Sequence, residues 1–214
     1  MASGLVIATA ACIAVGYLLW PTWRNAPVGE PDRIPVSVGG TVFNVPAHAF
    51  RMKVQKHPGP QDRVDLAFVY PSLTAPDGPR RVSADTIEQD TKEPLDRLFV
   101  SIVAHGNSLA PDARARTIYP RYLDAPLTPP QDGLLSRPFR DGSPYGGEDL
   151  FFAQTPVLVA RCSREGTTPG MCLSESRDGN ADLTFRFPRQ WLMQWRDVAQ
   201  AMVRVTAQLQ GPRS

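Results

Sequence analysis

The sequence predicts an α+β protein, with one mainly antiparallel β domain that is packed by a C-terminal amphipathic helix. The chain has 214 residues and 22 prolines, none of them in residues 1–20. This proline content is about twice the usual share of about 5%. Because proline breaks helices, the body of the chain cannot be a helical bundle. Short apolar runs between Gly, Pro and Asp turns recur from residue 34 to 187, and residues 189–209 follow with helical spacing.

The N-terminus carries an uncharged apolar run, GLVIATAACIAVGYLLW, over residues 4–20. As a helix it is about 25 Å long, at the short end for a bilayer span. Tyr17, Trp20 and Trp23 cluster at its end, as aromatic side chains do at a membrane interface. We expect a transmembrane anchor over 1–23 and a linker over 24–33. The segment MASG lacks Lys and Arg and no A-x-A site follows, which favours an uncleaved anchor over a cleaved signal peptide.

Two sequence signals indicate opposite sides of the membrane for the body of the chain. Arg24 and Arg33 follow the apolar run and no basic residue precedes it, which weakly favours a cytoplasmic body. Cys162 and Cys172 flank a turn-rich stretch, SREGTTPGM, and a hairpin there can bring them to disulfide distance. Disulfides persist in oxidising compartments. We therefore expect a single-pass inner-membrane protein with a periplasmic C-terminal domain; the alternative is two small apolar residues on neighbouring strands.

The first half of the body opens on a hairpin. Residues 34–38 and 41–45 are β-rich runs separated by Gly39-Gly40, a pair suited to a tight turn. A short continuation is expected over 49–55. Strands are expected over two mainly apolar runs, 63–71 and 97–106. Residues 83–93 are acidic and polar and predict a surface turn or short helix.

The second half begins with a stretch of weak periodicity. Residues 117–123 fit a strand, and 124–148 predict a long, proline-rich loop of the kind that often binds a partner. Three strands then follow, at 155–162, 171–176 and 183–187. Residues 189–209 form a helix within a body domain spanning 34–210, and its apolar stripe packs on the sheet. The stripe consists of Trp191, Leu192, Trp195, Val198, Ala199, Met202, Val205 and Leu209.

The common catalytic and cofactor motifs do not occur in the sequence. It lacks G-x-S-x-G, H-E-x-x-H, G-x-G-x-x-G and a Walker lysine, so we expect no enzyme activity, cofactor or metal. Acidic pairs such as Glu148-Asp149 or Asp85 with Glu88 leave a glycosidase-like site open, although neighbours in a strand face opposite ways. The net charge of +2 is too balanced for a protein that coats nucleic acid.

Residues 114–152 are the best candidate for an interaction surface. This segment interleaves Tyr and Arg, which are enriched among interface anchors, with Gly and Pro. The alternative is an ordinary packed loop whose tyrosines belong to the core. The residues expected to bind a partner are Arg116, Tyr119, Arg121, Tyr122, Phe139, Arg140 and Tyr145.

Several motifs run in order through residues 33–200: IPVSVGGTVFNVPAHAFR, DLAFVYPSL, YPRYL, YGGEDLFFA, VARC and LTFRFPRQWLMQW. They resemble those of a family of uncharacterised, single-pass anchored proteins from alphaproteobacteria and their relatives. The resemblance implies an anchored, periplasmic, β-rich domain and carries no functional residues over to this chain.

These observations together favour a binding protein held at the inner membrane, with a protein or another envelope component as its partner. One version is an immunity-type protein that neutralises a toxin acting in the periplasm, and another is an envelope accessory protein. The first alternative is a periplasmic hydrolase with converging carboxylates or His105 in a deep pocket. The second is an accessory subunit of a membrane complex that makes its contacts through residues 4–20.

Overall fold

The computed structural model describes residues 32–76, 96–124, 128–164, 166 and 169–211. The predicted anchor over 1–23, most of the linker and the predicted turn or helix over 83–93 lie outside these residues. Within the described ranges, no helix is both long enough and apolar enough to cross a bilayer.

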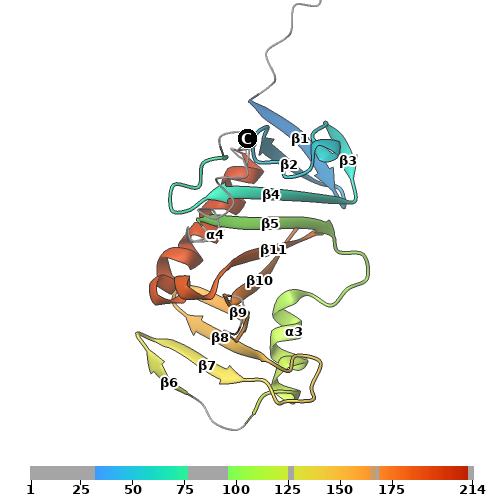
Figure 1. Ribbon diagram of the computed structural model, residues 1–214. Coiled ribbons are helices and arrows are strands. Elements are labelled where there is room, and N and C mark those ends of the chain that lie inside the picture. The colour runs from blue at the N-terminus through green and yellow to red at the C-terminus, as the bar shows by residue number, and fades with distance from the viewer. Residues whose placement is uncertain (1–31, 77–95, 125–127, 165, 167–168, 212–214) are drawn as a thin grey trace, which may run out of the picture. The chain divides into compact units, whose positions relative to one another are not determined.

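The main element of the fold is an eight-stranded sheet in which every pair of neighbours is antiparallel. Its strands stack in the order β4-β5-β11-β10-β9-β8-β7-β6 (Figure 1). This confirms the α+β class and a mainly antiparallel domain. The bounds are β4 Arg63–Val69, β5 Arg97–Ala104, β6 Thr128–Gln131, β7 Leu134–Pro138, β8 Glu148–Gln154, β9 Val157–Ser163, β10 Met171–Asp178 and β11 Ala181–Pro188.

A second, three-stranded sheet is built on the predicted hairpin. β1 (Arg33–Val38) pairs antiparallel with β2 (Thr41–Pro46), and Val38 lies opposite Thr41 across the two glycines. β3 (Gly59–Gln61) adds to β1 in parallel. Val36, Val38 and Phe43 are buried in the same core as the larger sheet, because alternate residues of each strand face it.

The turns of two hairpins interlock at one end of β11. The Thr41 hydroxyl accepts a hydrogen bond from the Asn180 backbone N–H at 2.9 Å. Gly39, at φ +60°, lies so close that a Cβ there would stand 2.4 Å from the Asn180 carbonyl oxygen. Glycine is therefore needed at position 39 for both its backbone angle and its lack of a side chain.

The C-terminal segment confirms the predicted helix and refines it. Residues Arg189–Gln194 form a 3-10 turn, η3, and α4 runs from Trp195 to Gln210. The predicted apolar stripe is buried, apart from Leu192, which is partly buried. Trp191 stacks on Tyr70, with ring centroids 4.1 Å apart. The helix thus covers one face of the sheet, as its spacing predicted.

A short helix, α3 (Pro111–Thr117), packs on the other face of the sheet. Along β9, Leu158, Ala160 and Cys162 belong to the core that contains α4. Val159 belongs instead to a smaller cluster with Tyr119, which directly follows α3. Since successive residues of a strand point to opposite faces, α3 and α4 cover opposite sides of this part of the sheet.

Three predictions for the less periodic segments are wrong. Residues 117–123 are not a strand but the end of α3 and a 3-10 turn, η2 (Tyr119–Arg121), because proline at 111 and 120 favours helical first turns there. The loop expected over 124–148 contains β6, β7 and the start of β8. The expected continuation over 49–55 is a bridge at Phe50 followed by a 3-10 turn, η1 (Lys53–Gln55).

Candidate functional site

Strands β9 and β10 are neighbours in the sheet, yet they pair at one end only. The pairs are Cys172 with Cys162, Leu173 with Arg161, and Ser174 with Ala160. β10 continues to pair with β11 as far as its last residue, and β9 pairs with β8 along its whole length. The sheet is therefore split beyond Ser174, between residues 157–159 of β9 and 175–178 of β10.

A disulfide joins Cys162 to Cys172 at the closed end of this split. The two residues lie directly opposite each other in the ladder, with their Cα atoms 3.9 Å apart, and both are buried. The predicted cysteine pairing is confirmed. The bridge holds β9 and β10 together where only three residue pairs do so through the backbone.

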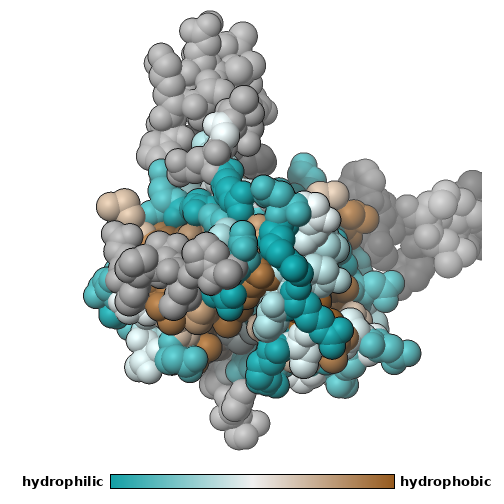
Figure 2. Space-filling model, turned by 90° about the horizontal axis from the view of Figure 1, so that it is seen from below, coloured by the Kyte–Doolittle hydropathy of each residue, from teal (hydrophilic) through white to brown (hydrophobic). Residues whose placement is uncertain are grey.

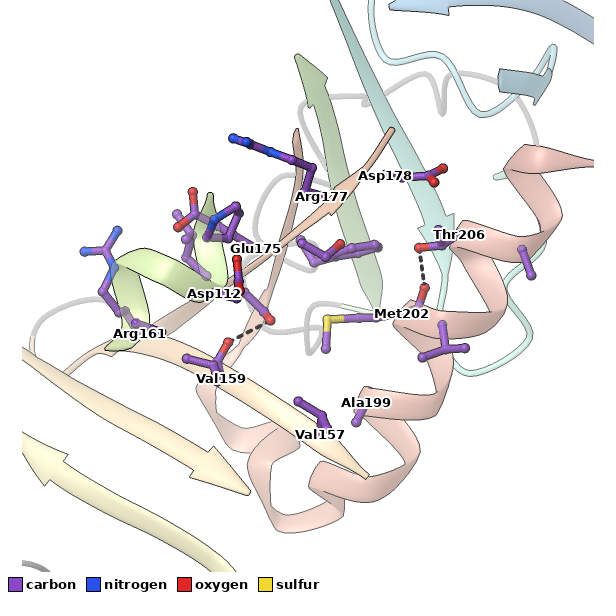
Figure 3. Close-up of a pocket in the computed structure, with 18 of the residues that line it drawn as sticks. Asp112, Val157, Val159, Arg161, Glu175, Arg177, Asp178, Ala199, Met202 and Thr206 are labelled. Atoms are coloured by element: carbon purple, nitrogen blue, oxygen red, sulfur yellow. Dashed lines mark hydrogen bonds between the residues drawn. The ribbon is translucent and has the colours of Figure 1, made fainter. Parts of the chain in front are cut away.

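A pocket of about 600 Å³ occupies the split. Both helices line it although they lie on opposite faces of the sheet: α3 contributes Pro111, Asp112 and Ala115, and α4 contributes residues from Ala199 to Gln210. Figure 3 shows α3 on one side of the pocket, α4 on the other, and Val157 and Val159 of β9 below. The pocket thus passes through the sheet rather than lying on one of its faces.

The strand β10 presents its edge to this pocket. All six consecutive residues from Leu173 to Asp178 line it. A pocket that met the face of a strand would be lined by alternate residues, as β9 does with Val157, Val159 and Arg161. Six consecutive lining residues therefore mean that the pocket lies beside the edge of β10, next to the backbone groups that β9 leaves unpaired.

The walls near the sheet are apolar. Val157 on β9 is 72% exposed and Val203 on α4 is 68% exposed, both unusually high for valine in a folded domain. Val159, Leu173, Phe185 and Met202 add to the apolar lining. These side chains form a surface that a partner could cover with a gain from apolar burial.

The charged residues around the pocket are bound to one another. Arg114 pairs with Glu175 at 3.0 Å, Arg161 with Glu148 at 2.6 Å, and Arg177 with Asp182 at 2.7 Å. Asp112 pairs with Arg116, and the Gln210 amide donates to Asp178. The rim is therefore neutralised within the chain and selects no strongly charged ligand.

Several ionisable groups at or beside the pocket have shifted pKa values, among them Tyr119 in the lining and Asp182 next to Arg177. Burial raises the pKa of the Tyr119 phenol, whose hydroxyl lies 3.4 Å from Glu175 Oε2. Burial is the largest single effect on Asp182 and acts to raise its pKa, but the hydrogen bonds from Arg177 and Ser108 and the charges of Arg177 and Arg114 together lower the net pKa. Tyr119 thus stays neutral and Asp182 charged near neutral pH, and neither is poised for proton transfer.

The predicted partner-binding residues fall into a buried group and an exposed group. Tyr119 and Phe139 belong to the small core on the α3 side, and Tyr122 and Tyr145 pack against it. The Arg161 guanidinium lies 4.9 Å from the centre of the Tyr145 ring. Arg116, Arg121 and Arg140 are exposed, and the surface at this end of the domain mixes hydrophilic residues with small apolar patches (Figure 2). Of the seven, Tyr119 also lines the pocket. A partner-binding role for these residues stays a prediction.

Of the acidic candidates for catalysis, Glu148 and Asp149 are engaged in ion pairs, and Asp85 and Glu88 lie outside the described residues. Glu148 pairs with Arg161, whereas Asp149 pairs with both Arg164 and Arg189. His105 does not line the pocket. Among the residues that the structure describes, no group of three His, Cys, Asp or Glu side chains is placed to hold a metal ion. The pocket offers apolar contact and backbone hydrogen bonding more than acid–base chemistry.

Apart from Tyr119, sequence reasoning did not single out the residues of this pocket as a binding site. Val203 carried a usable signal, because it is an apolar residue on the polar side of the helix, beside Arg204. The edge of β10 carried none, since its exposure depends on where pairing with β9 stops.

Comparison with solved structures shows what this fold is similar to. The chain resembles Smlt3025, an immunity protein of the Stenotrophomonas maltophilia type IV secretion system, with a TM-score of 0.55 at 13% identity. That likeness covers 83% of this chain and 93% of the other. The iron-regulated outer membrane lipoprotein FrpD of Neisseria meningitidis has a TM-score of 0.41 at 12% identity, over 82% of this chain and 94% of that one. No protein-family model and no curated protein matches the chain.

Proposed function

We propose that this chain is an immunity-type binding protein, anchored in the inner membrane, that neutralises a toxin in the periplasm. The observation that carries the proposal is the pocket through the split sheet. Its walls are apolar, its rim charges are paired, and its floor is an unpaired strand edge. Such a site suits the capture of another protein, because it combines apolar burial with backbone hydrogen bonds.

Two further observations support the proposal. The fold resembles that of a protein described as an immunity protein, over most of both chains. The disulfide between Cys162 and Cys172 suits an oxidising compartment such as the periplasm. With the anchor expected over 1–23, the domain would stand at the membrane surface, where it would meet an incoming toxin. An envelope accessory protein that binds a resident partner would use the same site.

A hydrolase is the less favoured function. Its active site would need carboxylates free to exchange protons, yet Asp112, Glu175 and Asp178 at the pocket each have a bonded partner. An accessory subunit of a membrane complex would make its contacts through residues 4–20, which lie outside the described residues.

Co-expression with the products of neighbouring genes tests the proposal. Each open reading frame adjacent to this gene is expressed in a bacterial host with an export signal, alone and together with the full chain, and growth is measured. We expect one exported product to arrest growth and the full chain to restore it. A chain that lacks residues 1–23 is the matched control, and it should leave the cells unprotected because it stays in the cytoplasm.

The proposal fails if no neighbouring product is toxic in the periplasm, or if the full chain leaves the toxicity unchanged. Protection by the control without residues 1–23 would place the toxin in the cytoplasm and would also contradict it.

A further inference from the structure

The edge of β10 is a row of backbone groups without a partner strand. The Met171 N–H donates to Ser163 Oγ at 2.9 Å, so the backbone groups of Met171 point toward β9. Because backbone groups alternate in direction along a strand, those of Leu173, Glu175 and Arg177 also point toward β9. Ser176 and Asp178 point toward β11, with which they pair.

Arg177 lies where β9 has already moved away. Pairing between β9 and β10 ends at Ser174 with Ala160. Within the described part of the chain, no hydrogen bond engages the backbone N–H or C=O of Arg177. Unpaired backbone groups beside an apolar surface are unusual, since they normally find a strand, a side chain or water.

We propose that an extended segment of the partner protein enters the split and pairs with β10 at residues 175–178, as an added strand. This inference rests on the proposed function, because it names how the partner is held. The segment would take the place that β9 vacates and would thereby complete the sheet. Main-chain bonds would supply affinity, and the side chains at alternate positions would supply specificity.

The lining defines the chemistry of that segment. Val157 on β9 and Val203 on α4, both largely exposed, line the pocket together with Val159 and Met202. The charges at the rim are already paired within the chain. The occupant should therefore be an uncharged stretch with apolar residues at every second position and no proline at the pairing positions.

A phage-displayed library of random linear heptapeptides is the probe, selected against the full chain in detergent micelles. We expect enrichment of uncharged sequences with alternating apolar residues. A synthetic copy of a selected peptide should lose at least about tenfold in affinity when the backbone N–H groups at alternate positions are methylated. Methylation at the intervening positions should change affinity little, because those groups point away from β10.

Two matched variants locate the binding site on the chain. Val203→Arg places a charge on the pocket wall, and we expect it to weaken peptide binding at least about tenfold. Met193→Arg introduces the same charged side chain at a residue that is 84% exposed and does not line the pocket. It should leave peptide binding unchanged. Both sites are exposed on the C-terminal segment, so both variants should fold.

The edge itself is tested by a second pair of variants. Arg177→Ala and Arg177→Pro both remove the ion pair with Asp182, but only proline removes the backbone N–H that faces the split. We expect binding to survive the alanine change and to be lost with proline.

Two results would overturn the inference. One is the absence of enriched peptides, and the other is a peptide affinity that neither methylation nor Val203→Arg changes. Such a result leaves the proposed function standing if the full chain still protects cells from the neighbouring toxin. Peptide binding without protection would contradict the proposed function and leave the strand addition intact.

Discussion

Ser174 donates a hydrogen bond from its hydroxyl to the backbone carbonyl of Val159 at 2.8 Å, at the point where β9 and β10 part. Ser174 is 7% exposed, and it is the last residue of β10 to pair with β9. A side chain thus bonds to the carbonyl beside the split, where backbone pairing ends. The serine at position 174 therefore satisfies a carbonyl group at the edge of the split.

Loss of this contact should weaken the domain. Ser174→Ala leaves the Val159 carbonyl without the hydroxyl, and we expect the free energy of unfolding to fall by about 1 kcal/mol. Ser176→Ala, two residues along the same strand at an exposed site, is the control and should change little. Urea unfolding monitored by tryptophan fluorescence measures both. Equal stabilities of the two variants would contradict the role given to Ser174.

Removal of the disulfide should have a larger effect. The double variant Cys162→Ala, Cys172→Ala should lower the free energy of unfolding by about 2–4 kcal/mol, because the bridge restricts the unfolded chain and holds the closed end of the split. The wild-type chain should lose a similar amount of stability in dithiothreitol once the bond is reduced. Identical melting curves with and without reductant, after confirmed reduction, would count against the bridge.

The interlocked turns give a third prediction. Gly39→Ala places a methyl group 2.4 Å from the Asn180 carbonyl oxygen, whereas Gly40→Ala meets no atom within 4 Å. Both glycines have positive φ, so each change costs about 1–2 kcal/mol of backbone strain. Gly39→Ala should lower the melting temperature further than Gly40→Ala. The reverse order would show that the two turns do not touch as described.

Acid should weaken the domain in part through Asp65. Hydrogen bonds from Arg63 lower the pKa of this carboxyl from its ordinary 3.8 to about 2, with help from Ser101 and Gln55 against the opposing effect of burial. Since the folded pKa is the lower one, the stabilisation is present above pH 3.8 and is lost as the pH falls toward 2.

The pH dependence can be separated with an amide in place of the carboxyl. Asp65→Asn should be less stable than wild type at pH 6, and the difference should shrink between pH 4 and pH 2. Asp62→Asn, at an exposed neighbour, serves as the control. Urea unfolding across this range gives the comparison. A difference that stays constant with pH would rule out the lowered pKa as its source.

The parts of the fold that were predictable are those governed by local pattern. Gly39-Gly40 between two β-rich runs predicted the first hairpin, and the cysteine spacing predicted the bridge between β9 and β10. The spacing of Trp195, Val198 and Met202 predicted the buried stripe of α4. In each case neighbouring residues alone decide which side chains share a face.

The remaining parts depend on tertiary contacts. β8 has three successive apolar residues, Leu150, Phe151 and Phe152, which pack on both faces of the sheet and therefore show no alternation. The split between β9 and β10 follows from where two strands stop pairing, which no local pattern encodes. The tyrosines of the predicted interaction segment pack against Phe139, because aromatic residues serve a small core as readily as an interface.

Amide hydrogen exchange at Arg177 tests the central claim most directly. In the free full chain in detergent, the Arg177 N–H should exchange at least about tenfold faster than the N–H of Ser176, which faces β11. Addition of a library-selected heptapeptide should slow exchange at Arg177 and leave Ser176 unchanged. Arg177 protected as well as Ser176 in the free chain, or unprotected in the presence of bound peptide, would contradict an open strand edge that receives a partner.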